Sequence, residues 1–281
     1  NFKQKVWLFL DEIHLIKNLP SVIKYLGDHY NIKFFLTGSA SFYLKNHFSE
    51  SLAGRKFTFE LFPFSFAEFL EASQAKQIKV KIPQEHKLIG QSVFSIIDNY
   101  YQEYLMFGGF PQVVSAQSIE EKKKNLQDVF NSYFELEVKG LSGFKKANEM
   151  RDLMFLLLAR VGNKLNITDL ANEVRIDSKT LTKYLSFLEA SYFIKLIKPF
   201  SHSIEIEIRK MPKVYVCDSG MANHLTFASG LNAPSKGSLF EQAVFQTLRT
   251  QKGALNYYQR KNGAEIDFIF NKKEAYEVKL N

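Results

Sequence analysis

Two apolar segments near the start of the chain each end in polar residues that could act on a phosphate group. VWLFL leads directly into Asp11 and Glu12, and IKFFL leads into Thr37, with Ser39 two residues later. Apolar segments without polar alternation are typical of parallel strands that are buried on both faces. A helix predicted between them completes a βαβ unit, in which the carboxyl ends of both strands meet at one edge.

This pattern predicts part of a P-loop nucleotide site. Asp11 would help to hold Mg²⁺, and Glu12 would orient or activate the attacking water. Thr37 or Ser39 would contact the γ-phosphate. Arg55 follows in SLAGR, where it would either reach a γ-phosphate or bind a backbone carbonyl or carboxylate. The alternative for the Asp-Glu pair is an incidental helix cap or turn.

The phosphate-binding loop of such a site is not found in these residues. None of the 14 glycines is followed by lysine, so the chain has no Gly-Lys-Ser/Thr element. In the P-loop fold this loop precedes the Asp-Glu strand, and we therefore expect a chain that is truncated at its N-terminus. DEIH also resembles motif II of DExH helicases, but of their arginine-rich second-domain element only LAGRKF is found.

A second set of charged residues, near the C-terminus, resembles the core of PD-(D/E)xK nucleases. We expect Glu241 in the first turn of a helix and Asp267 on a strand after a turn at Asn262-Gly263. Glu277 and Lys279 would share one face of the next strand. The resemblance implies that Asp267 and Glu277 bind Mg²⁺ or Mn²⁺. Glu241 would support the site, and Lys279 would position water or stabilise the phosphorane charge. A degenerate fold or surface salt bridges remain the alternative, and we expect the last elements of the domain to be missing.

The centre of the chain is basic and predicts a helix-turn-helix. Residues 139–215 hold 14 Lys and Arg against 8 Asp and Glu, which suggests a polyanion as partner. A solvated basic face is the alternative. Asn166 and Asp177 are placed to cap two helices. The second helix would bury Leu181, Tyr184, Leu185 and Leu188. Its opposite face carries the candidate DNA-binding residues Lys179, Thr182, Lys183 and Ser186.

YFIKLIKP (residues 192–199), a turn at SHS and IEIEIRK (residues 204–210) would then form the wing hairpin of a winged helix. Lys179 and Lys183 could meet phosphates, whereas Glu205 and Glu207 on the wing would repel them. A winged helix that serves packing or protein contact is therefore the alternative to one that binds DNA.

The bulk composition agrees with a globular chain of several domains. The 281 residues carry a net charge of +8 and are 46% hydrophobic and 15% aromatic, which excludes global disorder. The single cysteine, Cys217, excludes an internal disulfide framework. A reducing, cytoplasmic location is the simplest expectation. No apolar run approaches the ~20 residues of a membrane span, so no membrane partner is predicted.

Several motifs together resemble one family. DEIH, the TGS strand, SLAGR, LFPFSFAEFL and YLMFGGFPQVV look like the AAA-type ATPases of bacteria and archaea that carry a C-terminal domain of unknown function. The resemblance implies ATP with Mg²⁺ as cofactor, and DNA, a protein partner or a homo-oligomer as partners.

The resemblance also implies the fold class and the division of the chain. The expected fold is α/β: a truncated P-loop parallel-sheet domain, a helical lid, a winged helix and a restriction-endonuclease-like α/β domain. The expected domains are the remainder of the ATPase core (1–62), the lid (63–138), the winged helix-turn-helix (139–213) and an incomplete nuclease-like domain (214–281). The function expected is ATP hydrolysis coupled to DNA or a protein partner. An ATP-regulated metal-dependent nuclease and a non-catalytic binding module are the alternatives.

Overall fold

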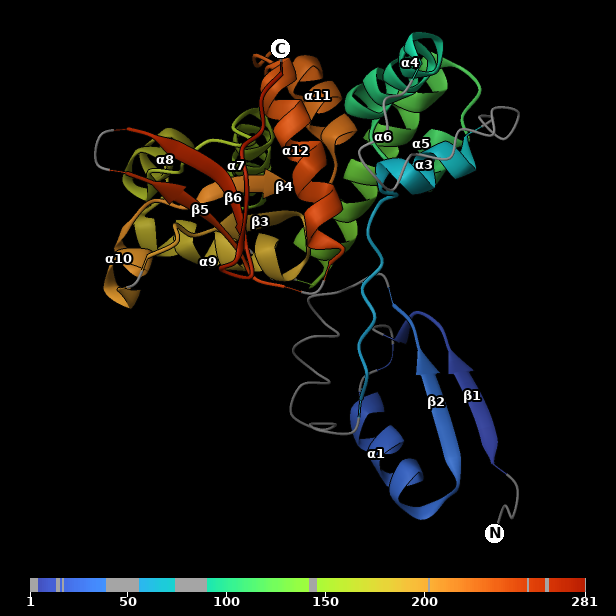
Figure 1. Cartoon of the computed structure of the whole chain (residues 1–281). Coiled ribbons are helices and arrows are strands. Elements are labelled where there is room, and N and C mark those ends of the chain that lie inside the picture. The colour runs from blue at the N-terminus through green and yellow to red at the C-terminus, as the bar shows by residue number, and fades with distance from the viewer. Residues whose placement is uncertain are drawn as a thin grey trace.

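The chain is a mixed α/β protein, described by a computed structural model. The described residues are 5–13, 16, 18–38, 56–73, 90–141, 146–201, 203–251, 253–260 and 263–280. A two-stranded parallel sheet, a two-stranded antiparallel sheet and a three-stranded antiparallel sheet lie among the helices. Figure 1 shows a small N-terminal unit joined by an extended segment, residues 56–65, to a larger and mostly helical body.

The N-terminal unit has the predicted βαβ arrangement. Strand β1 (Val6–Leu10) pairs in parallel with β2 (Ile32–Leu36). Helix α1 (Leu19–His29) connects them and packs Ile23 against the sheet, where Ile13 is also buried. The parallel register places the carboxyl ends of both strands at the same edge.

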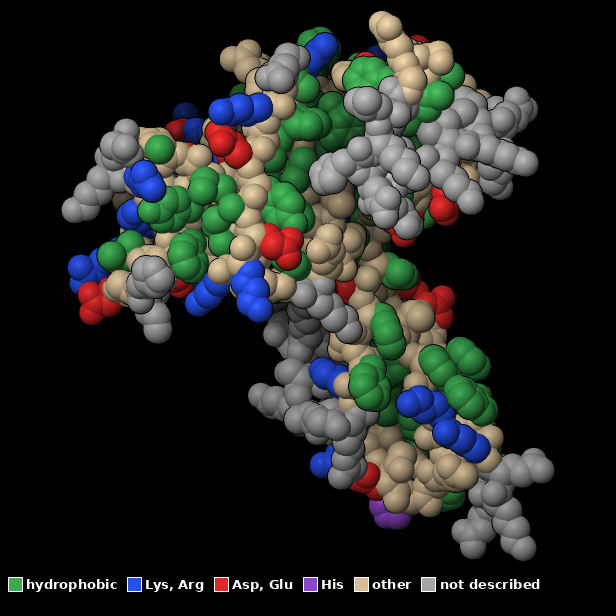
Figure 2. All heavy atoms as spheres, in the orientation of Figure 1, with side chains coloured by type: hydrophobic (Ala, Val, Ile, Leu, Met, Phe, Trp, Pro, Cys, Tyr) green, Lys and Arg blue, Asp and Glu red, His purple; other side chains and the backbone are tan. Residues whose placement is uncertain are grey.

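The sheet of this unit is covered on one face only, within the described residues. We expected both faces to be covered, because neither strand alternates apolar with polar residues along its whole length. Side chains alternate across a strand, and α1 covers only one set of them. On the other face Trp7 and Phe9 are 55% and 70% exposed, and Phe35 stacks on both. Figure 2 shows hydrophobic side chains gathered there, over β1.

A group of helices follows the extended segment, in the region expected to form the lid. These elements are α3 (Phe66–Ala72), α4 (Gln91–Phe107), α5 (Pro111–Val114), α6 (Ile119–Tyr133) and the π-helical η3 (Phe134–Leu141). Ser65 starts α3 through a capping box, since its hydroxyl accepts from the Glu68 amide while the Glu68 carboxylate accepts from the Ser65 amide.

The central region contains the two helices of the predicted helix-turn-helix. Its elements are α7 (Ala147–Ala159), α8 (Ile167–Val174), α9 (Ser178–Ala190), β3 (Ile194–Ile197), α10 (Ile204–Arg209) and β4 (Lys213–Val216). The predicted caps are confirmed: Asn166 accepts from the Thr168 and Asp169 amides, and Asp177 accepts from the Thr180 amide. The predicted buried face of α9 is also confirmed.

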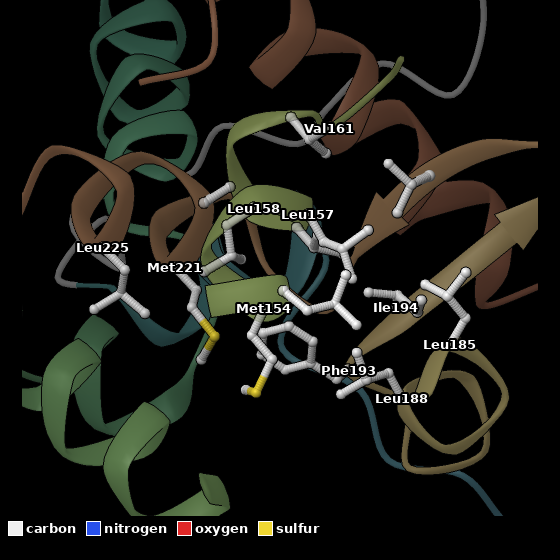
Figure 3. Close-up of a cluster of buried hydrophobic side chains, with 14 of the residues drawn as sticks. Met154, Leu157, Leu158, Val161, Leu185, Leu188, Phe193, Ile194, Met221 and Leu225 are labelled. Carbon is white, nitrogen blue, oxygen red and sulfur yellow. The ribbon is translucent and has the colours of Figure 1, made fainter. Parts of the chain in front are cut away.

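The second strand of the predicted wing hairpin, residues 204–210, is wrong, whereas its first segment does contain the strand β3. Residues 204–209 form the short helix α10, and the antiparallel partner of β3 is β4. The alternation of Ile and Glu favoured a strand, but a strand needs a pairing partner and β3 is paired with β4. The core of this region lies where α7, α9, β3 and the later helix α11 (Ser219–Ala228) meet (Figure 3). Met154, Leu188 and Met221 are fully or almost fully buried there.

The C-terminal region holds α11 (Ser219–Ala228), α12 (Lys236–Arg249), β5 (Leu255–Gln259), β6 (Glu265–Phe270) and β7 (Glu274–Tyr276). The strand order is β5-β6-β7, and both pairs are antiparallel. Two details differ from the expectation. Glu241 lies in the second turn of α12 because the helix begins earlier, at Lys236. Glu277 and Lys279 lie just beyond β7, which ends at Tyr276.

A buried carboxylate joins the segment between α4 and α5 to the C-terminal region. Asp218 is fully buried and caps α11 by accepting from the Gly220 and Met221 amides. It also accepts from the Gly109 amide at 2.7 Å. A Cβ on Gly108 would lie 1.8 Å from the Asp218 carboxylate, so glycine at position 108 permits this close approach. Within the described ranges, no helix combines the length and the apolar character needed to cross a membrane.

Candidate functional site

The first candidate site is the edge of the N-terminal sheet, which we call the strand edge and define as Asp11, Glu12 and Thr37. Asp11 directly follows β1 and Thr37 directly follows β2. The Thr37 hydroxyl donates a hydrogen bond to Asp11 Oδ1. Both side chains are exposed. Two residues that lie 26 positions apart in the sequence are thus neighbours, because parallel pairing aligns the strand ends.

Backbone contacts hold the strand edge in place. The Thr37 amide donates to the Leu10 carbonyl at 2.9 Å, and the Ile13 amide donates to the Thr37 carbonyl at 3.2 Å. Glu12, between these contacts, has a φ of 50°. A non-glycine residue in the left-handed region costs about 1–3 kcal/mol, and such residues cluster at functional sites. Ser39 and Arg55, the other residues predicted for this site, lie outside the described residues.

The second candidate site is the exposed face of α9. Lys179, Thr182, Lys183 and Ser186 are all exposed there. Thr182 and Ser186 donate to the carbonyls one turn earlier, at 2.8 and 2.9 Å. A shallow depression of about 200 Å³ lies beside these two residues, and Lys198 and Lys210 are part of its lining. The face therefore presents cations and hydroxyl groups to solvent.

The third candidate site is in the C-terminal region, and its centre is a lysine that the sequence analysis did not identify. Lys213, the first residue of β4, has a side chain only 4% exposed. Its ammonium lies 3.0 Å from Glu241, 2.6 Å from Glu265 and 3.0 Å from Asp267. We call Glu241, Glu265 and Asp267 the carboxylate cluster. They come from α12 and β6, so the lysine joins three elements.

Each carboxylate of this cluster has a further contact. The Tyr215 hydroxyl donates to Glu241, and the Lys164 ammonium bonds the second oxygen of Glu265. The Val278 amide donates to the second oxygen of Asp267 at 2.9 Å. The cluster is thus tied to the surrounding protein on all three carboxylates.

Protonation of the cluster follows from burial and from these contacts. Burial alone lowers the pKa of Lys213, but the charge of Glu241 and the hydrogen bonds to Glu265 and Asp267 outweigh it and raise the pKa above the ordinary lysine value. Burial raises the pKa of Glu241, and the nearby Lys213 charge opposes this shift. Burial also acts to raise the pKa of Glu265, yet hydrogen bonds from Lys164 and Lys213 lower it overall.

Glu277 and Lys279 lie at the rim of this region. Their side chains are 52% and 73% exposed, and they form a 2.8 Å ion pair with each other. The hydrogen bond and charge of Glu277 raise the pKa of Lys279, and the charge of Asp267 adds to the effect. Of the four residues predicted for a nuclease-like site, the structure brings Glu241 and Asp267 together around Lys213 and pairs Glu277 with Lys279.

One sequence signal could have revealed part of the carboxylate cluster. Glu265 and Asp267 are two residues apart on one strand, so both must lie on the same face. Lys213 gave no such signal, because it is 28 and 54 residues away from Glu241 and Asp267. Among the described residues, no group of three or more His, Cys, Asp or Glu side chains has an arrangement that could hold a metal ion.

Comparisons with known proteins agree with part of the resemblance seen in the sequence. Residues 1–70 match a family model described as an AAA domain. Residues 98–235 match a domain of unknown function (DUF8612), and residues 236–281 match another (DUF4143). The strand edge lies inside the AAA match, and Glu241, Glu265 and Asp267 lie inside the last match.

The similar curated proteins are all uncharacterized. A protein of Methanocaldococcus jannaschii is 28% identical over 96% of this chain and 60% of its own length. One of Haemophilus influenzae is 24% identical over 99% of this chain and 68% of its own length. One of Mycobacterium tuberculosis is 24% identical over 96% of this chain and 58% of its own length. The chain therefore spans roughly 60% of the relatives it matches. No solved structure matches it.

Proposed function

We propose that the strand edge of this chain is part of the site at which an ATPase module of the AAA type hydrolyses ATP. The observation that carries the proposal is the hydrogen bond from Thr37 to Asp11 at the ends of two adjacent parallel strands. This is the place where a P-loop ATPase needs a carboxylate for Mg²⁺ and a polar group near the γ-phosphate. The match of residues 1–70 to an AAA domain supports the same function.

The residues of the strand edge fit Mg²⁺ bound together with a nucleotide. Such Mg²⁺ usually has only one or two protein carboxylates, with phosphate oxygens and waters as its other ligands. Asp11 is exposed at the strand end and meets this need. The bound ion would neutralise charge on the phosphate oxygens.

The protein groups of the strand edge then have separate roles. The hydrogen bond from Thr37 fixes the orientation of the Asp11 carboxylate. Glu12 would accept a proton from the attacking water or hold that water in line. Its left-handed backbone turns it out of the alternation of β1, so that it need not lie on the face opposite to Asp11.

ATP hydrolysis by the complete protein that contains this chain tests the proposal. We expect Glu12→Gln to lower the turnover rate by about 100-fold or more while nucleotide binding is kept. Asp28→Asn is the matched control, because Asp28 lies in the last turns of α1, at the opposite end of the unit. An unchanged rate in Glu12→Gln, with the control also unchanged, would refute the proposal.

A second function, DNA binding through α9, is supported by a separate observation. The exposed lysines and hydroxyls of α9 lie beside Lys198 and Lys210. The elements α7, α8, α9, β3 and β4 occur in the order of a winged helix, with the short helix α10 between β3 and β4. An antiparallel β-bridge joins the backbones of Lys164 and Lys213 next to the β3–β4 pair. On this proposal residues 139–213 are a winged helix whose helix α9 meets the phosphates.

The salt dependence of DNA affinity tests this second function. Removing two phosphate contacts with Lys179→Ala plus Lys183→Ala should reduce the slope of log affinity against log salt by about 2. Lys195→Ala is the control, because Lys195 lies on the neighbouring strand β3 and its ammonium is paired with Glu189 at 2.9 Å. If the double variant keeps the wild-type slope, α9 does not meet the phosphates.

A further inference from the structure

The carboxylate cluster has the residue types of a divalent-metal site, but a lysine lies at its centre. An ammonium has three N–H donors, and Lys213 has three carboxylate partners at 2.6 to 3.0 Å. Each donor therefore has one acceptor. The side chain is 4% exposed, so the ammonium is a fixed and enclosed cation.

A metal ion would need the position that the ammonium fills. Mg²⁺ lies about 2.0–2.1 Å from its oxygen ligands and Ca²⁺ about 2.3–2.6 Å. The three carboxylates converge on the Nζ atom at 2.6 to 3.0 Å, so a metal ion bound by all three would have to replace the ammonium and draw the carboxylates closer. Two cations at this separation would repel each other strongly in a buried site.

We infer that the ammonium of Lys213 is the resident cation of the carboxylate cluster, and that the native chain binds no divalent metal there. The nuclease-like residues of this region thus do not fit the metal that a PD-(D/E)xK site requires. The cluster holds α12, β4 and β6 together, and the C-terminal region serves as a structural or binding unit that does not cleave DNA.

The surrounding contacts leave the lysine little freedom to withdraw. Lys213 is the first residue of β4. Its backbone pairs with Ile197 of β3 and forms an antiparallel β-bridge with Lys164. The outer oxygens of Glu265 and Asp267 are held by Lys164 and by the Val278 amide. The enclosed charge of the carboxylates is balanced mainly by the two lysines. Loss of Lys213 would leave several carboxylates without compensation, which is the condition that attracts a divalent ion.

Titration of the protein with Mn²⁺ tests this inference. Carboxylate sites accept Mn²⁺, and bound ion is counted from its electron paramagnetic resonance signal. All samples carry Asp11→Asn and lack nucleotide, so that the strand edge does not contribute. The variants are Lys213→Met, the same change combined with Asp267→Asn, and Lys164→Met as the matched control. Lys164→Met removes a lysine from the same cluster but leaves its centre filled.

We expect no Mn²⁺ at the cluster in the protein that carries only Asp11→Asn, or after the further change Lys164→Met. Adding Lys213→Met should raise the Mn²⁺ affinity at least about tenfold above that of the Asp11→Asn protein. Adding Asp267→Asn as well should abolish this gain. A Lys213→Met protein that folds but gains no affinity would overturn the assignment of the lysine to a cation position.

A second measurement on the unchanged lysine decides the inference even if Lys213→Met does not fold. In protein with ¹⁵N-labelled lysine, the enclosed Lys213 ammonium should give a signal protected from exchange, identified by its loss in Lys213→Arg. The signal should persist when Mn²⁺ is added. If Mn²⁺ selectively broadens the Lys213 signal, and if Asp267→Asn or Glu241→Gln prevents this broadening, a metal binds at the cluster. That result would overturn the inference.

Discussion

The strand edge and the carboxylate cluster use similar residues in opposite ways. Asp11 at the strand edge is exposed, and its partner is a neutral hydroxyl from Thr37. Asp267 in the cluster is 17% exposed and bonds the enclosed ammonium of Lys213. The first carboxylate is open to a cation from solution, whereas the second already has one from the protein.

Carboxylate content alone therefore does not define a metal site. Enclosed carboxylates need compensation, and a lysine supplies it permanently. Exposed carboxylates are stabilised by water and can exchange it for a cation that arrives with a ligand. For each site it therefore matters whether the cation nearest to the carboxylates is a side chain of the protein or an ion from solution.

The largest expected effect concerns stability at the enclosed site. Lys213→Ala should lower the free energy of unfolding by about 3–5 kcal/mol, because it leaves buried carboxylates unpaired. Asp11→Ala at the exposed site should change it by less than about 0.5 kcal/mol. Urea unfolding monitored by circular dichroism measures both. Equal effects at the two sites would remove the contrast between enclosed and open carboxylates.

A smaller effect is expected on catalysis at the open site. Thr37→Val removes the hydroxyl that orients Asp11 while nearly preserving the shape of the side chain, and should slow ATP hydrolysis about tenfold, or about 1.4 kcal/mol. Thr37→Ser keeps the hydroxyl and should stay within about twofold of the wild type. Steady-state hydrolysis at saturating ATP provides the test. A serine variant as slow as the valine variant would argue against the hydrogen bond as the cause.

The smallest expected effect is a pH dependence of stability that belongs to the enclosed site. The folded pKa of Glu265 is lowered by Lys164 and Lys213, although burial acts against this. Its stabilising contribution is present above the unfolded pKa of about 4.3 and is lost as pH falls through the folded value. Glu265→Gln should therefore unfold with a flatter pH dependence at acid pH.

Glu277→Gln is the control for this pH dependence, because Glu277 lies at the rim with its side chain 52% exposed. Thermal unfolding between pH 3 and pH 7 compares the variants. If Glu265→Gln follows the wild-type curve throughout, the two lysines do not stabilise the ionised form of Glu265.

Much of the fold could be predicted because it depends on local signals. The caps at Asn166 and Asp177 satisfy amides within three residues, and the buried face of α9 follows from its spacing. The meeting of Asp11 with Thr37 could be predicted as well, since parallel strands align their ends. These features need only the sequence around each element and one rule of sheet geometry.

The rest depends on pairing between distant parts of the chain. The alternation of residues 204–209 favours a strand, yet the segment is helical. The Glu207 carboxylate accepts from the Ser201 amide, and the Glu207 amide donates to the Ser203 carbonyl. The role of Lys213 depends on α12 and β6 both reaching the start of β4. No local pattern shows which lysine will be enclosed, so the nuclease-like interpretation placed its lysine at position 279 and did not anticipate the one at the centre.

Nucleotide-dependent Mn²⁺ binding tests the central contrast most directly. The complete protein that contains this chain would be titrated with Mn²⁺, with and without ATP, beside its Asp11→Asn and Asp267→Asn variants. We expect a bound Mn²⁺ signal that requires ATP, is lost in Asp11→Asn and persists in Asp267→Asn. A signal that needs no nucleotide, survives Asp11→Asn and disappears in Asp267→Asn would contradict the contrast.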